Sequence, residues 1–416
     1  MKKILISGAS IAGPALAFWL ARRGCAVTIV ERAAALRPGG YAIDVRGAAL
    51  DVAARMGLLP AMRAGGTDTL STQFLDARGR RLATFARGFG VISPEDVEIL
   101  RGDLALMLYA ATRHDVRYWF DDSITALAQD DRGVQVSFAQ RAAERFDYVI
   151  GADGLHSNVR ALAFGPEESF VRHLGSAIAI FSAGNYAGLD RAQLMLMAPR
   201  RVVSIKSDRG NGTVKATLLF AAPSVPDRRD VALQRRTVHA AFADLGGPVA
   251  ALLAALPTAP DFYFDAVCQA RVPSWQRGRV LLVGDAAYGP SPLTGQGTSL
   301  ALIGAYELAR AITADEDAVP AAVGARYESR LRAFVTRNQD VALGAAKNFA
   351  PMTSFGAWFR NVNLRMLPHL PWRDFVLAMM MRDIERAAKA HTLEDEPAPA
   401  ADYEHKALSY GARSLR

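Results

Sequence analysis

The sequence predicts an α/β fold, in which a Rossmann-like nucleotide-binding unit carries an inserted antiparallel sheet and a C-terminal helix. Three observations predict this class. Residues 3–31 follow the order strand, glycine-rich turn, helix, strand. Residues 167–270 contain strand-like runs joined by turn residues, as in an antiparallel sheet. The stretch "RVLLVGDAAYG" at residues 279–289 then returns to the continuous apolar pattern of a buried parallel strand.

The bulk composition limits the possible functions. The chain has 416 residues, is 51% hydrophobic and carries a formal net charge of +8. No basic run is interleaved with aromatic residues, so we expect no nucleic-acid partner. The apolar runs are short and interrupted, so we expect no signal peptide and no integral membrane span, and we expect a cytoplasmic monomer or homodimer. The seven histidines lack the spacing of metal ligands, so we expect no metal, and Cys25 and Cys268 lie in contexts typical of buried thiols.

The remaining elements are expected in the following order. The first half should contain a helix ending near Gly57 after the glycine pair 39–40, a hairpin over 72–86 turning at 78–79, a helix over 101–112, and three short strands with a final apolar strand over 116–151. The second half should contain strands over 173–183, 193–208, 213–223 and 262–272, helices around 228–256, 297–313 and 319–346, and a helical tail over 372–391 before loosely ordered residues.

These elements suggest a division into three parts. The predicted cofactor domain is assembled from residues 1–72, 101–166 and 271–350. The predicted substrate domain combines a hairpin segment, 73–100, with residues 167–270, and residues 351–416 form a C-terminal helical segment and tail.

The glycine turn "GASIAGP" is a variant of the dinucleotide-binding fingerprint. Gly8 and Gly13 meet the need for a tight turn and for close helix–strand packing, whereas Ser10 replaces the middle glycine. Serine is small and can donate a hydrogen bond to a phosphate, and Pro14 falls in the first helical turn, where its missing N–H is tolerated. Glu31, after the second strand, can accept from ribose hydroxyls. The turn therefore predicts a site for an ADP-containing cofactor, with a purely structural turn as the alternative.

A second stretch, "DYVIGADGLHSNVR", leads from a buried strand into a turn that contains Asp153 and Gly154. One interpretation is a strand-to-helix turn in which Asp153 caps the helix. The other is a ligand crevice, because a carboxylate flanked by glycines at the carboxyl end of a strand suits a crevice over a parallel sheet.

A third stretch, "VGDAAYGPSPLTGQG", places Gly284 and Asp285 at the end of a strand and leads into a helix that starts near Gly297. A strand-end aspartate can bind the hydroxyls of a polyol chain. The loop is rich in proline and glycine, which allows the backbone to approach a flat ligand closely. The helix start offers free N–H groups and the positive end of a dipole.

Taken together, the three stretches resemble the flavoprotein monooxygenases of the para-hydroxybenzoate hydroxylase type, over about residues 1–345. The resemblance implies that the first stretch holds the ADP moiety of FAD, and that the third holds its ribityl chain and pyrophosphate. The second would serve both FAD and a transiently bound NADH or NADPH. The "RGDL" and "ER…GG…RG" patterns are most similar to the tetracycline-inactivating monooxygenases within this family.

The resemblance also implies individual cofactor contacts, with Tyr41 and Ala42 in a segment similar to the family's mobile flavin segment. The implied contacts are Gly8, Ser10, Ile11, Ala12, Gly13, Glu31, Arg32, Gly40, Arg46, Arg101, Leu104, Asp153, Gly154, Gly284, Asp285, Pro292, Gly295, Gln296, Gly297 and Thr298. Three positions depart from the family pattern: Tyr288 stands where histidine is frequent, Ser299 where asparagine is usual, and Gly304 where an acidic residue is usual.

The activity that the resemblance implies is oxygenation of a small aromatic or polyketide-like substrate. NAD(P)H would reduce FAD, and dioxygen would add to give a flavin C(4a)-hydroperoxide that transfers one oxygen atom. The alternatives are a reductase or dehydrogenase of the same fold, and a non-catalytic flavin-binding protein. The tryptophan pair typical of flavin halogenases is absent.

Few side chains are predicted to take part in catalysis or substrate binding. No general base is predicted, and Tyr288 is a weak catalytic candidate for which core packing is the alternative. Met195, Met197 and Phe220 are candidate substrate contacts on the predicted sheet, and core packing explains them equally well. The C-terminal helix with its methionine run is either part of the core or a cover for the substrate entrance, as in the tetracycline-inactivating enzymes.

Overall fold

The computed structural model describes residues 1–36, 39–86, 95–207, 212–315, 318–348 and 353–394. Most of the predicted loosely ordered tail, residues 395–416, lies outside the described residues. Within the described residues, no helix has a stretch that is both long and apolar enough to cross a bilayer.

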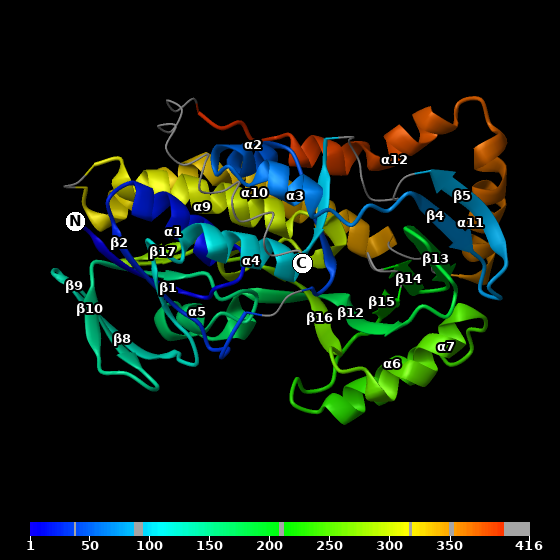
Figure 1. Cartoon of the computed structure of the whole chain (residues 1–416), viewed down its shortest axis with the longest axis horizontal. Helices are drawn as coiled ribbons and strands as arrows, with labels where there is room; N and C mark the ends of the chain where they lie inside the picture. Colours follow the sequence, from blue (N-terminus) through cyan, green and yellow to red (C-terminus); the bar gives the residue numbers. More distant parts are fainter. Residues whose placement is uncertain (37–38, 87–94, 208–211, 316–317, 349–352, 395–416) are drawn as a thin grey trace.

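The cofactor-side layer is a six-stranded sheet in the order β17-β18-β11-β1-β2-β7 (Figure 1). The strands other than β17 pair in parallel, and most of their residues are buried. This explains why they read as continuous apolar runs in the sequence. Their bounds are β1 (Lys3–Ser7), β2 (Ala26–Val30), β7 (Arg117–Trp119), β11 (Tyr148–Gly151), β17 (Gln276–Arg277) and β18 (Val280–Leu282).

Helices cover this sheet and confirm the βαβ unit predicted for residues 3–31. Helix α1 (Ala12–Arg22) follows β1, is buried over Ala12–Leu20, and packs against α9 (Gly297–Thr313). Pro14 is the third residue of α1, inside the first turn as predicted. The other helices of this region are α2 (Ala48–Arg55), α3 (Leu59–Ala64), α4 (Arg101–Thr112), α5 (Asn158–Ala163), α8 (Asp285–Tyr288) and α10 (Pro320–Asn348), with the 3₁₀ turns η1 (Glu167–Ser169) and η3 (Pro292–Thr294).

The second layer is a seven-stranded sheet in the order β16-β12-β15-β14-β13-β4-β5. It joins the predicted hairpin to the strands of residues 171–270 through a parallel pairing of β4 with β13. Helices α6 (Val231–Phe242) and α7 (Pro248–Ala255), with the 3₁₀ turn η2 (Leu256–Thr258), form a second apolar core against one face. The strands are β4 (Ser71–Leu75), β5 (Arg81–Ala86), β12 (Val171–Gly184), β13 (Ala192–Ala198), β14 (Arg201–Ser207), β15 (Thr213–Ala221) and β16 (Tyr263–Ala270).

Two small sheets complete the strand inventory of the described residues. Strands β8 (Ile124–Asp130), β9 (Gly133–Phe138) and β10 (Glu144–Phe146) form a three-stranded sheet. Strands β3 (Ala42–Val45) and β6 (Val97–Leu100) pair with each other, although the sequence indicated neither. Each has four residues, too few to show a period, and each becomes a strand through a partner more than fifty residues away.

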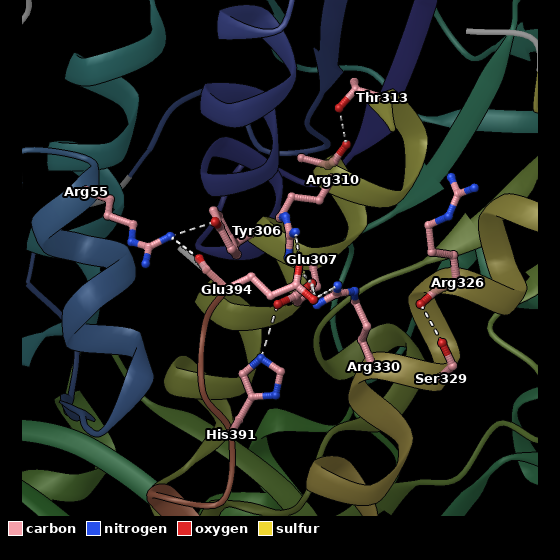
Figure 2. Close-up of polar contacts among 11 residues, drawn as sticks. Arg55, Tyr306, Glu307, Arg310, Thr313, Arg326, Ser329, Arg330, His391 and Glu394 are labelled. Atoms are coloured by element: carbon pink, nitrogen blue, oxygen red, sulfur yellow. Dashed lines mark hydrogen bonds and ion pairs between the residues drawn. The ribbon is translucent and has the colours of Figure 1, made fainter. Parts of the chain in front are cut away.

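The C-terminal segment folds back onto the cofactor-side helices. Helix α11 (Ser354–Met366), η4 (Leu367–His369) and α12 (Arg373–Ala388) lead to residues 391–394. Glu394 forms ion pairs with Arg310 and Arg330, and its carbonyl accepts from Arg55 Nη1 (2.9 Å) (Figure 2). His391 Nε2 lies 3.2 Å from a carboxylate oxygen of the buried Glu307. These contacts hold residues 391–394 against α2, α9 and α10.

Candidate cofactor and substrate site

A cavity of about 620 Å³ lies between the carboxyl ends of the parallel strands and one face of the seven-stranded sheet. It is lined by residues of all three predicted motifs and by side chains from β12, β13, β14 and β15. In open α/β sheets, the carboxyl ends of parallel strands form the crevice in which ligands bind. The cavity is therefore the candidate site for both cofactor and substrate.

The first turn fits a nucleotide because its two glycines leave no room for side chains. A Cβ on Gly13 would lie 1.9 Å from Gly8 O, and a Cβ on Gly8 would lie 2.6 Å from Ala152 O. Gly8 also has φ +108, which disfavours other residues. Helix α1 therefore starts directly beneath the turn, and Ser10, Ile11 and Ala12 line the cavity.

Glu31 is held in place by two backbone amides. Ala9 N donates to Glu31 Oε2 (2.9 Å), and Ala33 N donates to Oε1 (2.8 Å). The carboxylate thereby bridges the first turn to the end of β2, and it lines the cavity beside Arg32. One lone pair on each oxygen remains for a ligand hydroxyl, which fits a ribose.

Asp153 fits the crevice interpretation made from the sequence, whereas the interpretation as the helix N-cap is wrong. Its carboxylate accepts from Ser157 Oγ, from Val159 N (3.0 Å) and from Ser7 Oγ (3.3 Å), so it fastens the turn before α5. Ser157, not Asp153, is the N-cap, because its Oγ accepts from Arg160 N (3.0 Å). Asp153 and Gly154 nevertheless line the cavity. Burial raises the pKa of Asp153, and the three hydrogen bonds offset part of that increase.

Arg160 links the second motif to the third. It is fully buried, and it donates from Nη2 to Leu155 O (2.6 Å) and from Nη1 to Ala286 O (2.9 Å). Through these two bonds, the turn after β11 and helix α8 after β18 keep a fixed spacing at the rim of the cavity.

Asp285 is the carboxylate best suited to a polyol. It lines the cavity and has no hydrogen-bond partner among the described residues. The side chain is exposed to the cavity, but the surrounding protein desolvates the carboxylate and raises its pKa, an effect that the positive charge of Arg101 only partly offsets. Its oxygens can accept hydrogen bonds from a ligand that enters the cavity. The ribityl hydroxyls of FAD would donate such bonds.

The loop before α9 has further features that suit a bound ligand. Both side-chain polar atoms of the buried Gln296 lack hydrogen-bond partners in the described structure. Ser291 has φ +105, a conformation that a non-glycine residue adopts only under strain. Gly297 and Thr298 line the cavity at the start of the 17-residue helix α9, where N–H groups are free. Ser299, where the family pattern differs, accepts from Arg46 N (3.1 Å) and so joins α9 to β3.

The structure brings most of the predicted cofactor residues together. Those that line the cavity are Gly8, Ser10, Ile11, Ala12, Glu31, Arg32, Arg101, Asp153, Gly154, Asp285, Pro292, Gly295, Gly297 and Thr298. Those that lie behind or beside it are Gly13, Gly40, Arg46, Leu104, Gly284 and Gln296. Of the second group, Leu104 is fully buried and Arg46 is 3% exposed, so they support the wall without forming it.

Tyr288 does not occupy a catalytic position. Its side chain is 1% exposed, its hydroxyl pairs with that of Tyr327 (2.8 Å), and its ring packs against Trp275. Burial raises the pKa of Tyr288 to about 12. The residue belongs to the core beneath the cavity, which corrects the weak catalytic assignment. A Cβ on Gly304 would lie 1.8 Å from the Tyr288 hydroxyl, so these two departures from the family pattern are complementary.

The cavity face of the seven-stranded sheet is polar. Gln193, Ser204, Lys206, Lys215 and Thr217 line it, with Ile178 and Ile180 beside them. Gln193 Nε2 donates to Ser204 Oγ (2.7 Å), and both lysines are paired: Lys206 with Glu98 and Lys215 with Asp261 (2.5 Å).

The three predicted substrate contacts fall outside this lining. Phe220 faces the other way, where its ring lies 5.6 Å from that of Phe242 in the apolar core, so its assignment as a substrate contact is wrong. Met195 and Met197 share the Gln193 side of β13 but do not line the cavity, and Arg360 of α11 donates to Met197 Sδ. A substrate contact at these two methionines stays a prediction.

Sequence reasoning missed a chain of titratable groups at the cavity wall. Glu167 and Asp265 each lie 3.0 Å from a ring nitrogen of His156, and Tyr263 Oη donates to Asp265 Oδ2 (3.0 Å). Burial lowers the pKa of His156, but the two carboxylates outweigh it and raise the pKa above its usual value. His156, Tyr263 and Asp265 line the cavity. His156 stands within the second motif, but its partner Asp265 is too distant in sequence to be foreseen.

Asp44 is a second titratable group that the sequence did not indicate. It lines the cavity, and Arg46 Nη2 donates to its Oδ2 (2.7 Å). Burial raises the pKa of Asp44 to about 7 despite this ion pair. A Cβ on Gly295 would lie 2.9 Å from Asp44 Oδ2, which places the group against the loop that precedes α9.

Other chemistry is not indicated within the described residues. Cys25 and Cys268 are free and buried, as expected, and Cys268 lines the cavity. Among the residues that the structure describes, no group of three or more His, Cys, Asp or Glu side chains is arranged to hold a metal ion.

Comparisons with known proteins agree with this geometry. The FAD binding domain family model matches residues 1–342. The chain is 46% identical over 343 residues to an uncharacterised protein of Mycobacterium tuberculosis (strain ATCC 25618 / H37Rv), covering 82% of this chain and 92% of that protein. It is 41% identical over 365 residues to a flavin-dependent monooxygenase of an unknown prokaryotic organism, covering 86% and 94%. The crystal structure of tetracycline destructase Tet(55) has a TM-score of 0.82 at 37% identity, covering 95% and 99%.

Proposed function

The chain belongs to the FAD binding domain family, among its flavin-dependent monooxygenases, and from this premise we propose that it uses NADH or NADPH and dioxygen to oxygenate a polyoxygenated aromatic substrate of the polyketide kind. The main observation behind the proposal is that one continuous cavity extends from the three glycine-containing turns to a polar face of the seven-stranded sheet. The turns suit a cofactor, and the sheet face suits a substrate.

The residues at the turns fit FAD. The amides at the start of α1 and the hydroxyl of Ser10 would hold the pyrophosphate, Glu31 the ribose, and Asp285 the ribityl hydroxyls. The loop from Pro292 to Thr298 would lie along the flavin ring. Bound FAD supplies electron transfer from the nicotinamide nucleotide and the activation of dioxygen.

The sheet face suggests the substrate class. Gln193, Ser204 and Thr217 offer hydrogen-bonding groups to carbonyls and hydroxyls, while Ile178 and Ile180 offer an apolar surface to a ring system. The structural relative Tet(55) is named for inactivating tetracycline, a compound that combines these features. The chain's own lining therefore supports a flat substrate with several oxygen functions.

One edge of the same sheet supplies further polar groups for a substrate hydroxyl. Tyr263 and Asp265 lie on β16, Tyr263 Oη and His156 Nε2 both contact Asp265 Oδ2, and Glu167 contacts His156 Nδ1. Burial acts to raise the pKa of Asp265, but the hydrogen bonds from His156 and Tyr263 outweigh it and lower the pKa, so the carboxylate stays ionised and fixes the Tyr263 hydroxyl. A phenolic or enolic hydroxyl in the cavity can donate a hydrogen bond to Tyr263 Oη, which would orient the substrate ring.

The test uses purified protein loaded with FAD. NADH and NADPH oxidation and oxygen uptake are measured with and without a panel of phenols and aromatic polyketides, in isotopically labelled dioxygen. The proposal expects substrate-stimulated oxidation and a product that carries one labelled oxygen atom. A reduced product without label would indicate a reductase of the same fold, and a protein that binds no flavin would overturn the assignment.

A further inference from the structure

The C-terminal helices expose seven large apolar side chains, which together we call the C-terminal apolar face. Their exposed fractions run from 54% to 71%, although elsewhere side chains of this type are mostly buried. The face consists of Phe355, Trp358, Phe359, Met366, Trp372, Phe375 and Met379. It lies beyond residue 342, where the family match ends, and none of its members lines the cavity.

The spacing shows that the face is continuous along α11. Phe355, Phe359 and Met366 are separated by four and seven residues, so they project from one side of the helix. The opposite side is already used, because Ala357 is buried and Arg360 donates to Met197 on β13. Helix α11 therefore packs on the sheet with one side and presents the other to solvent.

Helix α12 extends the same pattern. Trp372 precedes the helix, and Phe375 and Met379 follow at spacings of three and four residues. No described residue of α12 lines the cavity, so covering the cavity does not explain the apolar side chains that α12 exposes. In Figure 1, α11 lies at the end of the molecule opposite β9 and β10, and α12 runs from there back along α10.

Basic side chains outnumber acidic ones around the face. The side chains of Arg365 and Arg382 are 53% and 57% exposed, and their ion pairs within the described residues are long, at 3.9 Å from Asp76 and 3.9 Å from Asp383. Arg373 and His369 are also exposed. Aromatic rings flanked by arginine suit the interface of a bilayer, where rings lie at headgroup depth and guanidinium groups bind lipid phosphates. Aromatic side chains and arginine are also enriched at protein interfaces, and the experiment below therefore includes a second copy of the chain as an outcome.

The described segment after α12 leads away from this face. Residues 391–394 run toward α2, where the Glu394 carbonyl accepts from Arg55 and its carboxylate pairs with Arg310 and Arg330 (Figure 2).

We propose that the C-terminal apolar face docks on the surface of an anionic lipid bilayer. Helices α11 and α12 lie in the interface, the rings of Trp358, Phe359 and Phe375 enter the headgroup region, and the arginines contact lipid phosphates. The inference is independent of the substrate and of the flavin reaction.

The test is co-sedimentation of the FAD-loaded full chain with vesicles of phosphatidylcholine alone and with about one third phosphatidylglycerol. We expect binding to the anionic vesicles and binding at least about tenfold weaker to the neutral ones. Tryptophan fluorescence gives a second readout, because Trp358 and Trp372 are 58% exposed while Trp19 and Trp275 are buried. Their emission should shift to the blue and be quenched by brominated lipid.

The decisive variant is Phe355→Ser with Trp358→Ser and Phe375→Ser, which changes only exposed side chains. It should keep its flavin and lose at least about tenfold in vesicle affinity. The matched control, Tyr186→Ser with Val319→Ser, removes side chains that are 63% and 65% exposed and should bind as the parent does.

Four outcomes would overturn the proposal. The first is equal binding by the two variants, and the second is no vesicle binding by the parent. The third is a concentration-dependent dimer that the triple variant abolishes, since a second copy would then be the occupant. The fourth is vesicle binding that appears only after residues 395–416 are removed, since those residues would then cover the face.

Discussion

Replacing Gly13 by alanine tests whether the first turn holds FAD by close backbone packing. The added Cβ would lie 1.9 Å from Gly8 O, whereas real contacts of this kind are essentially never below 3.0 Å. Helix α1 and the Gly8 turn must therefore separate by about 1 Å, and overpacking of this kind costs about 1–3 kcal/mol. The displaced groups are the amides that would face the pyrophosphate, so FAD binding should weaken by about 5-fold to about 150-fold.

The assay is titration of apoprotein with FAD, followed by flavin fluorescence, together with thermal unfolding of the apoprotein. Ser10→Gly is the control, because it adds no atoms to the turn; it should retain FAD, with binding weakened at most by the loss of one hydroxyl–phosphate hydrogen bond. Gly13→Asp adds a negative charge as well as bulk and should leave the protein colourless. An unchanged FAD affinity in Gly13→Ala, in a protein that melts at the parent's temperature, would refute the reasoning.

Three further predictions test other parts of the site. Asp285→Ala should weaken FAD binding by about 1.5–3 kcal/mol without lowering the melting temperature of the apoprotein, because no described residue bonds to this carboxylate; a lower apoprotein melting temperature would contradict this. Gly304→Ala should destabilise folding by about 1–3 kcal/mol in thermal unfolding, and Tyr288→Phe should restore part of that loss, because the new Cβ collides with the hydroxyl; additive effects would argue against it. His156→Gln should destabilise the fold most near pH 6 and least near pH 9 in unfolding measured as a function of pH. The pKa of His156 is higher in the folded than in the unfolded protein, so its contribution to stability is complete below the unfolded-state pKa and is lost as the pH rises through the folded-state pKa. A loss of stability that does not depend on pH would exclude this explanation.

The parts of the fold that the sequence predicted correctly are those whose signals are local. The βαβ unit and the helix over residues 297–313 match the structure because buried strands, a glycine turn and helical spacing all lie within short windows. The same holds for the position of Asp285, which the sequence places just after a buried strand and which lines the cavity; its hydroxyl partner stays a prediction.

The parts that the sequence did not predict correctly depend on distant neighbours. A period of two shows that Phe220 shares a face with other residues of β15, but not that α6 covers that face. Tyr288 and Gly304 each looked like a separate departure from the family pattern, and only the crossing of the Tyr288 side chain to α9 shows that they complement each other. His156 lies in a recognised motif, yet its partner Asp265 is 109 residues away.

The contacts of residues 391–394 with α2, α9 and α10 determine the shortest part of the chain that can fold as one unit. The family match stops at residue 342, inside helix α10, which continues to Asn348. A fragment that ends at that boundary would cut this helix and remove His391 and Glu394, and would leave the buried Glu307 with only its arginine neighbours. The part of the chain matched by the family model is thus shorter than the unit of folding, and limited proteolysis should yield a stable core that still contains the segment after α12.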